Sequence, residues 1–246
     1  MPTEVTQLIK SHRSIRQYKD QPIAEEVLQE ILDCAQWAPS SHHVQAYSVI
    51  VVRSSEVKEK LSALAGNQRW VKECPVFLVF CADYYRLQQV CEMHGQTLAA
   101  DEVESLLVGA VDTALAAENV LLAARSHGLG GVMIGGIRNN PREVANVLGL
   151  PTLTVPLMGM CLGYPAQDVQ QKPRLPKRAV IHEERYQTER IAGALEEYEQ
   201  TTSEYYSERT NGQRTDGWTK QMADYLNKPR RAHVTPFIKE QGMRLT

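Results

Sequence analysis

The sequence of 246 residues has few cysteines, and those few follow no pattern. The five cysteines are an odd number, are scattered along the chain and include no C-x-x-C pair, which argues against a disulfide scaffold or a zinc ribbon. Cys81 and Cys161 stand in apolar runs, where we expect small buried hydrophobic residues. Free thiols of this kind fit a reducing compartment, so the sequence predicts a cytoplasmic location.

Long hydrophobic runs and an excess of one charge are also missing. No stretch reaches the roughly 18 consecutive apolar residues of a membrane span, and the first residues contain no apolar signal core. Lys and Arg number 27 against 29 Asp and Glu, and aromatic residues make up only 7% of the chain. This balance argues against a nucleic acid or a membrane as partner. Any anion must therefore be bound by a local cluster of cations.

The common nucleotide and metal motifs are absent. The P-loop pattern G-x-x-x-x-G-K-[ST] does not occur. The glycine cluster GLGGVMIGG, residues 128–136, lacks the third glycine of the dinucleotide fingerprint and follows a predicted helix rather than a strand. The patterns of elbow hydrolases, zincins and EF-hands are missing, and the histidines have no metal-ligand spacing, so we expect no metal site.

Hydrophobic periodicity predicts helices that alternate with a few apolar strands. Helices are expected near residues 5–9, 27–35, 57–64, 101–127 and 141–149, and strands at 47–52, 75–83, 131–134 and 154–163. The helix over 101–127 is apolar nearly all round, which predicts the spine of the core. Helices outnumber strands, which favours an α+β fold. Trp37 and Trp70 stand at apolar helical positions and are expected to be packing residues.

Charge changes sign within the last quarter of the chain. Residues 183–208 hold eight glutamates against two arginines, a net charge of −6, whereas residues 209–246 carry a net charge of +5. The segment 205–214, which opens the basic stretch, is rich in Gly, Asn, Thr and Ser and is predicted to be a mobile loop.

Two cationic segments are candidates for a local anion site. HRSIR, residues 12–16, follows the first predicted helix, and KPRLPK, residues 172–177, lies far along the chain. Arg offers a planar fork of donors, Lys a point charge, and Ser and His further donors, so the two segments together suit a terminal phosphate monoester. On spacing alone, two separate solvated basic patches account for these residues equally well.

Several further segments occur in order along the chain: HRSIRQY, APSSHHVQ, LAGNQRWV, FCADYYR, VGAVDTALAAENVLLAA, GLGGVMIGGIRNN, LGLP, GMCLGYP and KPRLP. Together they resemble the nitroreductase superfamily over nearly the whole chain, in particular its NADPH-dependent nitroreductases and flavin reductases. The resemblance implies an α+β nitroreductase-like fold with a central mixed sheet flanked by helices, in a single FMN-binding domain over residues 1–246. Residues 183–246 are then a helical and basic excursion that shapes the NADPH site and extends over the partner in an interlocked homodimer.

The resemblance also implies which residues bind FMN. In the family, such residues contact the phosphate, the ribityl chain and the ring edges of FMN, and a serine turn comes from the partner subunit. The matching positions here are His12, Arg13, Ser14, Arg16, Ser40, Ser41, His43, Gln68, Gly135, Gly136, Lys172 and Arg174. Arg16 in this set stabilises the reduced flavin. Many relatives have Asn where this chain has His43. Arg209 and Arg214 match arginines that contact the phosphates of NADPH.

The implied activity is that of an oxidoreductase with NADPH as co-substrate. Hydride taken from NADPH onto FMN is delivered as two electrons, in ping-pong order, to nitroaromatics, quinones or similar small acceptors. The flavin N5 carries the hydride, so no catalytic side chain is required. A flavin reductase that supplies reduced FMN is an alternative on the same residues, and a non-catalytic FMN-binding protein is a second one.

Overall fold

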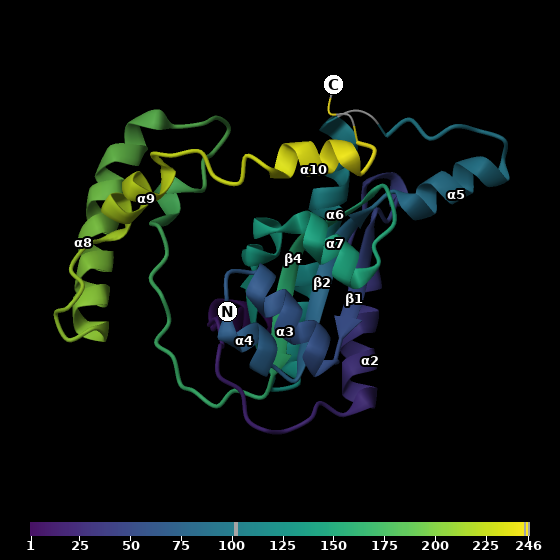
Figure 1. The fold of residues 1–246 in the computed structure, drawn as a ribbon. Helices are drawn as coiled ribbons and strands as arrows, with labels where there is room; N and C mark the ends of the chain where they lie inside the picture. The colour runs from purple at the N-terminus through teal and green to yellow at the C-terminus, as the bar shows by residue number, and fades with distance from the viewer. Residues whose placement is uncertain (101–102, 244, 246) are drawn as a thin grey trace. The chain divides into compact units, whose positions relative to one another are not determined.

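The computed structural model describes residues 1–100, 103–243 and 245, and it divides the chain into two compact units (Figure 1). The first unit combines Met1–Val169 with Arg231–Thr246, and the second is Gln170–Arg230. The two units are described separately below. The organisation as one domain with an excursion from residue 183 stays a prediction.

The first unit is built on a four-stranded sheet with the strand order β1-β2-β4-β3. The strands β1 (Tyr47–Val52), β2 (Val76–Asp83), β3 (Gly130–Ile134) and β4 (Thr154–Gly163) lie where the sequence predicts them. Within the described residues, neighbouring strands pair antiparallel, and a parallel pairing occurs at an isolated bridge between Ser14 and Gly131. The α+β class is confirmed. The sheet is antiparallel rather than mixed, because the parallel segment at residue 14 is too short to form a strand.

Five helices of the first unit lie where the periodicity predicts helices: α1 (Glu4–Lys10), α2 (Glu25–Asp33), α3 (Ser55–Leu64), α6 (Val103–Ser126) and α7 (Pro141–Leu148). The first two residues of the predicted helix 101–127 lie outside the described part. Pro141 occupies the first turn of α7, and Gly149 ends that helix in the left-handed conformation at φ +64°. The helices α4 (Arg69–Glu73), α5 (Tyr85–Met93) and α10 (Val234–Glu240) were not predicted from the hydrophobic periodicity.

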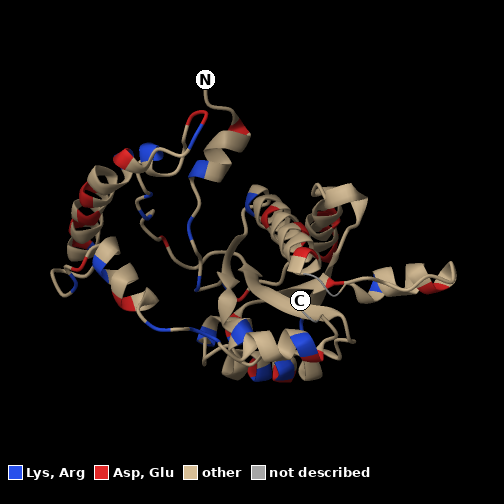
Figure 2. Ribbon diagram, turned by 90° about the horizontal axis from the view of Figure 1, so that it is seen from above, with Lys and Arg blue, Asp and Glu red and all other residues tan. Residues whose placement is uncertain are grey.

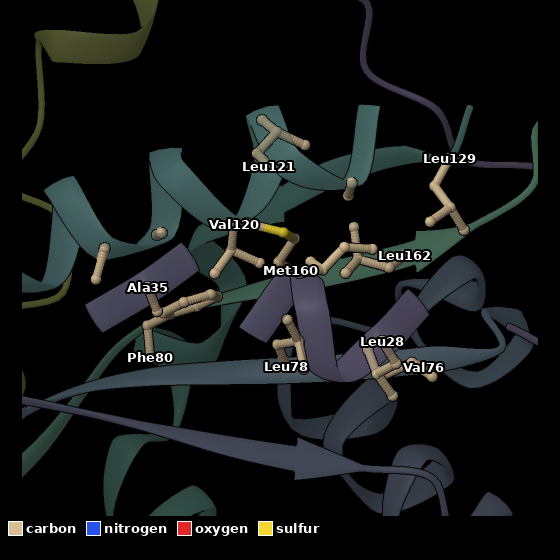
Figure 3. Packing of buried hydrophobic residues seen from close by; sticks show 14 residues of the cluster. Leu28, Ala35, Val76, Leu78, Phe80, Val120, Leu121, Leu129, Met160 and Leu162 are labelled. Atoms are coloured by element: carbon tan, nitrogen blue, oxygen red, sulfur yellow. The ribbon is translucent and has the colours of Figure 1, made fainter. Parts of the chain in front are cut away.

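β2 lies between β1 and β4, and its alternate side chains enter two separate cores. Leu78 and Phe80 pack with Met160 of β4 in the core that α2 and α6 cover (Figure 3). Phe77 and Val79 face the opposite way and pack in the core that α3, α4 and α7 cover. Because both of its faces are buried, β2 is a continuous apolar run without polar alternation.

The two cysteines expected in the core are both buried, which confirms that prediction. Cys81 and Cys161 belong to the core under α3, α4 and α7. Burial raises the pKa of the Cys81 thiol to about 12, so this thiol stays protonated at neutral pH. Trp70 also packs against this core, as predicted.

The helix α6 covers the sheet with one face and leaves an apolar stripe open on another. By length and composition alone, it is the one helix among the described residues that is long and apolar enough to cross a membrane, with a mean hydropathy of 1.6. In the structure it packs against β1, β2, β3 and α2. Leu107, Val111 and Leu115 on its other side stay exposed, and so does Trp37 of η1 (Cys34–Trp37). The predicted packing of Trp37 is therefore not made within one chain.

The second unit consists mainly of α8 (Ile191–Arg209) and α9 (Trp218–Leu226). The rings of Tyr198 and Trp218 join the two helices, with their centroids 5.6 Å apart. Glu199 of α8 accepts a hydrogen bond from the backbone N–H of Thr219 at 2.6 Å, which satisfies a donor in the first turn of α9. The acidic residues that give 183–208 its negative charge lie mostly along α8 (Figure 2).

Candidate functional site

The first cationic segment runs beside β3 as an extended chain. Ser14 bridges Gly131, and the N–H of Ile15 donates to the carbonyl oxygen of Gly131 at 3.0 Å. Ile15 is buried, whereas Ser14 and Arg16 on either side of it are half-buried. Side chains alternate along extended backbone, so Ser14 and Arg16 share the side away from the core. The sequence HRSIR thus presents its polar groups together by burying its one apolar residue.

One glycine of the GLGGVMIGG cluster makes this approach possible. A Cβ on Gly130 would lie 2.5 Å from Cγ1 of Ile15, so a side chain there would push the cationic segment off β3. A Cβ on Gly131 would instead lie 2.8 Å from the carbonyl oxygen of Cys161, so this glycine allows β3 to pack beside β4. The cluster that fails as a dinucleotide fingerprint therefore holds the cationic segment in place.

Arg13 carries a positive charge that no carboxylate of the described residues balances, because it is in no ion pair among them. It lies near Arg125 of α6, which donates to the carbonyl oxygen of Leu8 and to Oγ of Ser11, the latter at 2.8 Å. Burial lowers the pKa of Arg125; Glu118 opposes this shift, and the charge of Arg13 adds to it. Two neighbouring guanidinium groups repel each other, and an anion bound between them would relieve that repulsion.

The other end of β3 brings two predicted residues together. The strand leads into η3 (Gly135–Asn139), and a Cβ on Gly136 would lie 2.3 Å from both the carbonyl oxygen of Ala65 and Nε2 of Gln68. Gln68 Nε2 donates to that same carbonyl at 2.8 Å. A Cβ on Gly135 would meet only the Arg138 guanidinium, at 3.4 Å, so the space beside Gly135 is open within this chain.

Arg16 lies against α4, the helix that follows Gln68. Its guanidinium carbon lies 5.5 Å from the ring centroid of Trp70, two residues after Gln68. The strand from Gly131 to Gly135 rises by about 13 Å, at roughly 3.3 Å per residue. Cations therefore stand at one end of this stretch, and an amide and an open glycine stand at the other. This donor set fits an elongated ligand with an anionic group at one end and a polar-edged ring at the other.

The serine turn lies at the opposite edge of the sheet. Ser40 precedes η2 (Ser41–His43), and the turn leads into β1. Because β1 and β3 are the two edge strands, about 14 Å of sheet separates them at roughly 4.8 Å per strand. A single chain therefore does not bring Ser40, Ser41 and His43 to the cationic segment.

The turn also holds three non-glycine residues in the left-handed region: His42 at φ 49°, His43 at 58° and Gln45 at 54°. Such conformations cost on the order of 1 kcal/mol each and persist only where surrounding groups fix them. The group that fixes this turn is the buried carboxylate of Asp112 on α6, which accepts from Ser40 Oγ at 2.7 Å. Sequence reasoning missed Asp112, although a carboxylate in the apolar middle of a helix predicted to be the spine of the core is a signal that could have found it.

The second cationic segment belongs to the second unit and is anchored on α8. The hydroxyl of Tyr198 donates to the carbonyl oxygen of Pro173 at 3.0 Å. Arg174 Nη1 donates to the carbonyl oxygens of Lys172 and Pro173 at 3.0 and 3.3 Å. Burial raises the pKa of Tyr198, and the positive charge of Arg174 opposes that shift. That Lys172 and Arg174 join Arg13 around one phosphate stays a prediction.

Arg209 and Arg214 are each held by a tyrosine rather than by a glutamate. Arg209 Nη1 donates to the hydroxyl of Tyr205 at 2.9 Å, and the Arg214 guanidinium lies 4.0 Å over the ring of Tyr206. Neither arginine forms an ion pair with a carboxylate of the described chain. The two guanidinium groups therefore keep their charge available for a bound anion.

The prediction of a loop over residues 205–214 is wrong for 205–209, which form the last turn of α8, and the loop that follows is hydrogen-bonded to that helix. The N–H of Arg214 donates to Thr210 Oγ1 at 2.9 Å, and Ser203 Oγ donates to the carbonyl oxygen of Thr215 at 2.6 Å. The N–H of Gly212 donates to the carbonyl oxygen of Ser207 at 2.8 Å. Ser and Thr hydroxyls are typical of flexible loops, but here they form hydrogen bonds with the backbone of the loop.

Comparisons with known proteins cover both units. The profile of the Nitroreductase family matches residues 9–164, and that of the Nitroreductase family, C-terminal domain, matches residues 172–246. A Cr(VI) reductase from Pseudomonas sp. (strain G-1) is 43% identical over 97% of this chain and 98% of its own. An FMN reductase (NADPH) from Bacillus subtilis (strain 168) is 42% identical over 95% of this chain and 96% of its own. The structure of the NADPH:FMN oxidoreductase from Vibrio harveyi complexed with NAD+ superimposes with a TM-score of 0.90 at 38% identity, covering 98% of this chain and 99% of that one.

Proposed function

Since this chain belongs to the nitroreductase family, we propose that it is an FMN-dependent oxidoreductase that takes hydride from NADPH and delivers two electrons to a small acceptor. The observation that carries the proposal is the arrangement along β3. Arg13, which forms no ion pair with the described residues, stands with Ser14 near one end of the strand, and Gln68 stands with Gly135 at the other. This set suits the phosphate and the ring edge of FMN.

When bound, FMN supplies a ring that accepts hydride and gives up electrons in pairs. The chain's own residues bind and orient it. Arg13, with Lys172 and Arg174, donates charge-assisted hydrogen bonds to the phosphate, and His12 and Ser14 add further donors. Gln68 orients the polar edge of the ring, and Gly136 keeps Gln68 in place by leaving room for its amide.

Two more residues of the first unit shape the ring site. Arg16 adds a permanent positive charge that stabilises negative charge on the reduced ring. Gly135 has no Cβ, so backbone groups can approach the ring closely. The serine turn with Ser40, Ser41 and His43 completes the site from a second chain, since the sheet order separates it from β3.

The acceptor is a small molecule that takes two electrons. The chain's relatives include proteins named Cr(VI) reductase and FMN reductase (NADPH), and the family is named for nitro compounds. We propose nitroaromatics and quinones as acceptors, with free FMN and chromate as the alternatives that these names favour. The five free cysteines fit a reducing cytoplasm as the site of action.

A steady-state comparison of acceptors tests the proposed function. NADPH oxidation is measured with a nitrofuran, a quinone, free FMN and chromate, each over a range of concentrations. We expect parallel double-reciprocal plots, since one substrate leaves before the other binds, and the largest kcat/KM for the nitroaromatic or the quinone. The largest kcat/KM for free FMN would make the protein a flavin reductase, and no oxidation of NADPH with any acceptor would contradict the proposal.

Removing one phosphate-binding arginine should weaken FMN binding. A charge-assisted hydrogen bond contributes about 1.5 to 3 kcal/mol, so Arg13→Ala and Arg174→Ala should each raise the Kd for FMN roughly tenfold or more. Titration of the apoprotein by flavin fluorescence measures this. Arg53→Ala is the matched control, because Arg53 is an exposed arginine that pairs with Glu25 at the β1 edge. An unchanged Kd in both Arg13→Ala and Arg174→Ala would reject the phosphate assignment.

The choice of NADPH over NADH should depend on Arg209 and Arg214. If they bind the 2′-phosphate, which only NADPH carries, Arg209→Ala or Arg214→Ala should lower kcat/KM for NADPH roughly tenfold or more and leave NADH nearly unchanged. Arg178→Ala in the same unit is the control, because Arg178 already pairs with Glu197 at 2.5 Å. Equal losses with both nucleotides would instead indicate damage to the loop, and no loss with either would remove both residues from the NADPH site.

We propose that the protein is a homodimer joined across α6. Val103, Leu107, Val111 and Leu115 recur every four residues, share one face of the helix and are 37 to 56% exposed. An apolar stripe of this length on a long helix is typical of an interface. The predicted extension of residues 183–246 over the partner belongs to the same proposal.

Charge placed in the apolar stripe should dissociate the dimer. We expect the double variant Leu107→Glu/Val111→Glu to sediment as a monomer and to lose FMN, because each ring site needs a turn from the other chain. Ala63→Glu, which adds a carboxylate to an exposed position of α3, should stay dimeric. Sedimentation velocity with absorbance at a flavin wavelength reads both properties. A wild-type monomer that retains flavin would contradict the proposal.

A further inference from the structure

A buried carboxylate ties the long core helix to the turn before β1. Asp112 of α6 is only 1% exposed. It accepts hydrogen bonds from Ser40 Oγ at 2.7 Å, from the N–H of Ala46 at 3.0 Å and from the N–H of Ser41 at 3.4 Å. The carboxylate thus contacts the turn at its first residues and at its last.

The hydroxyl of Ser40 closes the turn from within. Ser40 Oγ donates to Asp112 and accepts from the N–H of Gln45 at 2.7 Å. His42 and His43 lie between Ser40 and Gln45, and the residues of this turn with positive φ are His42, His43 and Gln45. The strained part of the turn is therefore spanned by one hydroxyl that is itself fixed by the buried carboxylate.

A guanidinium holds the same turn from the other side. Arg86 Nη2 of α5 donates to the carbonyl oxygens of Gln45 and Tyr47 at 2.7 and 2.9 Å. Arg86 also lies 3.6 Å from the Asp83 carboxylate at the end of β2. Two backbone N–H groups at the ends of the turn thus donate to a carboxylate, and two carbonyl groups at its end accept from a guanidinium, which fixes the backbone from both sides.

The Asp112 charge is balanced by these donors rather than by a cation. No Lys, Arg or His of the described residues forms an ion pair with it. A buried carboxylate needs donors because burial without them is costly. Two of its donors are backbone N–H groups of the turn, so moving the turn would leave the charge unsatisfied. The turn and the core helix must therefore keep their relative position.

We propose that Asp112 is a positioning residue for electron transfer, because its carboxylate holds the Ser40–Gln45 turn in the one arrangement in which Ser41 and His43 meet the ring site of the partner subunit. The inference rests on the proposed function, in which this turn lines the ring site. It adds a residue that touches neither cofactor nor substrate and acts through the backbone of the turn.

The test compares Asp112→Asn with Thr113→Val. Asn keeps the shape of the side chain but replaces one carboxylate oxygen with an N–H₂ group, so the N–H of either Ala46 or Ser41 loses its acceptor. Thr113 is the next residue of α6 and is fully buried, but its hydroxyl donates within the helix to the carbonyl oxygen of Gly109 at 2.6 Å. Thr113→Val therefore disturbs the same helix without touching the turn.

Two readouts are needed, the first of which does not depend on activity. Hydrogen exchange read by mass spectrometry should show at least tenfold faster exchange in residues 40–47 of Asp112→Asn, with the strands unchanged, and no such change in Thr113→Val. Ser40→Ala should give the same local increase if Asp112→Asn folds poorly. Steady-state kinetics should show kcat/KM for the acceptor reduced about tenfold to a hundredfold in Asp112→Asn, as misplaced site residues produce. The Kd for FMN should change less than that, since the phosphate is held elsewhere.

Faster exchange in the turn with kinetics like the wild type would overturn the inference, because the turn would then not position anything. Equal losses and equal exchange throughout the chain in Asp112→Asn and Thr113→Val would also overturn it, since Asp112 would only stabilise the fold. Wild-type protein that neither retains FMN nor oxidises NADPH would reject the proposed function and this inference together. Normal turnover by the wild type together with an unaffected Asp112→Asn variant would instead reject the inference alone.

Discussion

The close approach of the HRSIR segment to β3 is the constraint on which the candidate site depends. Ile15 must be buried for Ser14 and Arg16 to face the same side, and it can be buried only because Gly130 has no Cβ in its way. The parallel bridge to Gly131 then fixes where the cations stand relative to the far end of the strand. That one contact sets the position of Arg13 beside Arg125. It also sets the distance from the cations to Gln68 and Gly136.

The helix α6 relates this site to the rest of the molecule. One of its faces closes the core over β2 and β4, its last turn holds α1 through Arg125, and its buried Asp112 holds the turn before β1. Its exposed apolar stripe is left for a second chain. Because the turn and the cationic segment lie at opposite edges of one sheet, a second chain is also what brings them together in the proposed function.

Much of the fold could be predicted from the sequence, and the reasons are local. The strands at 47–52 and 76–83 are short, mostly apolar runs rich in β-branched and aromatic residues, and α7 has Pro141 and Gly149 at its ends. The antiparallel pairing could not be predicted, because it depends on which strands meet in space. The hydrogen bonds of the loop after α8 could not be predicted for a similar reason: the hydroxyl of Thr210 suits either an open loop or a hydrogen-bonded one, and only the neighbouring groups in space decide between them. The two cationic segments, residues 12–16 and 172–177, could be found as candidates for an anion site from their residue types. The other candidate site residues came from a resemblance, and the role of the glycines and of Asp112 needed the structure.

The central claim is that this chain holds FMN and passes hydride from NADPH through it. The most direct measurement is an anaerobic titration of the purified protein with NADPH, followed by absorbance. We expect a yellow protein whose visible flavin band bleaches with about one equivalent of NADPH per FMN and returns when an acceptor is added. A colourless protein that takes up no FMN, or a flavin band that NADPH does not bleach, would contradict the account.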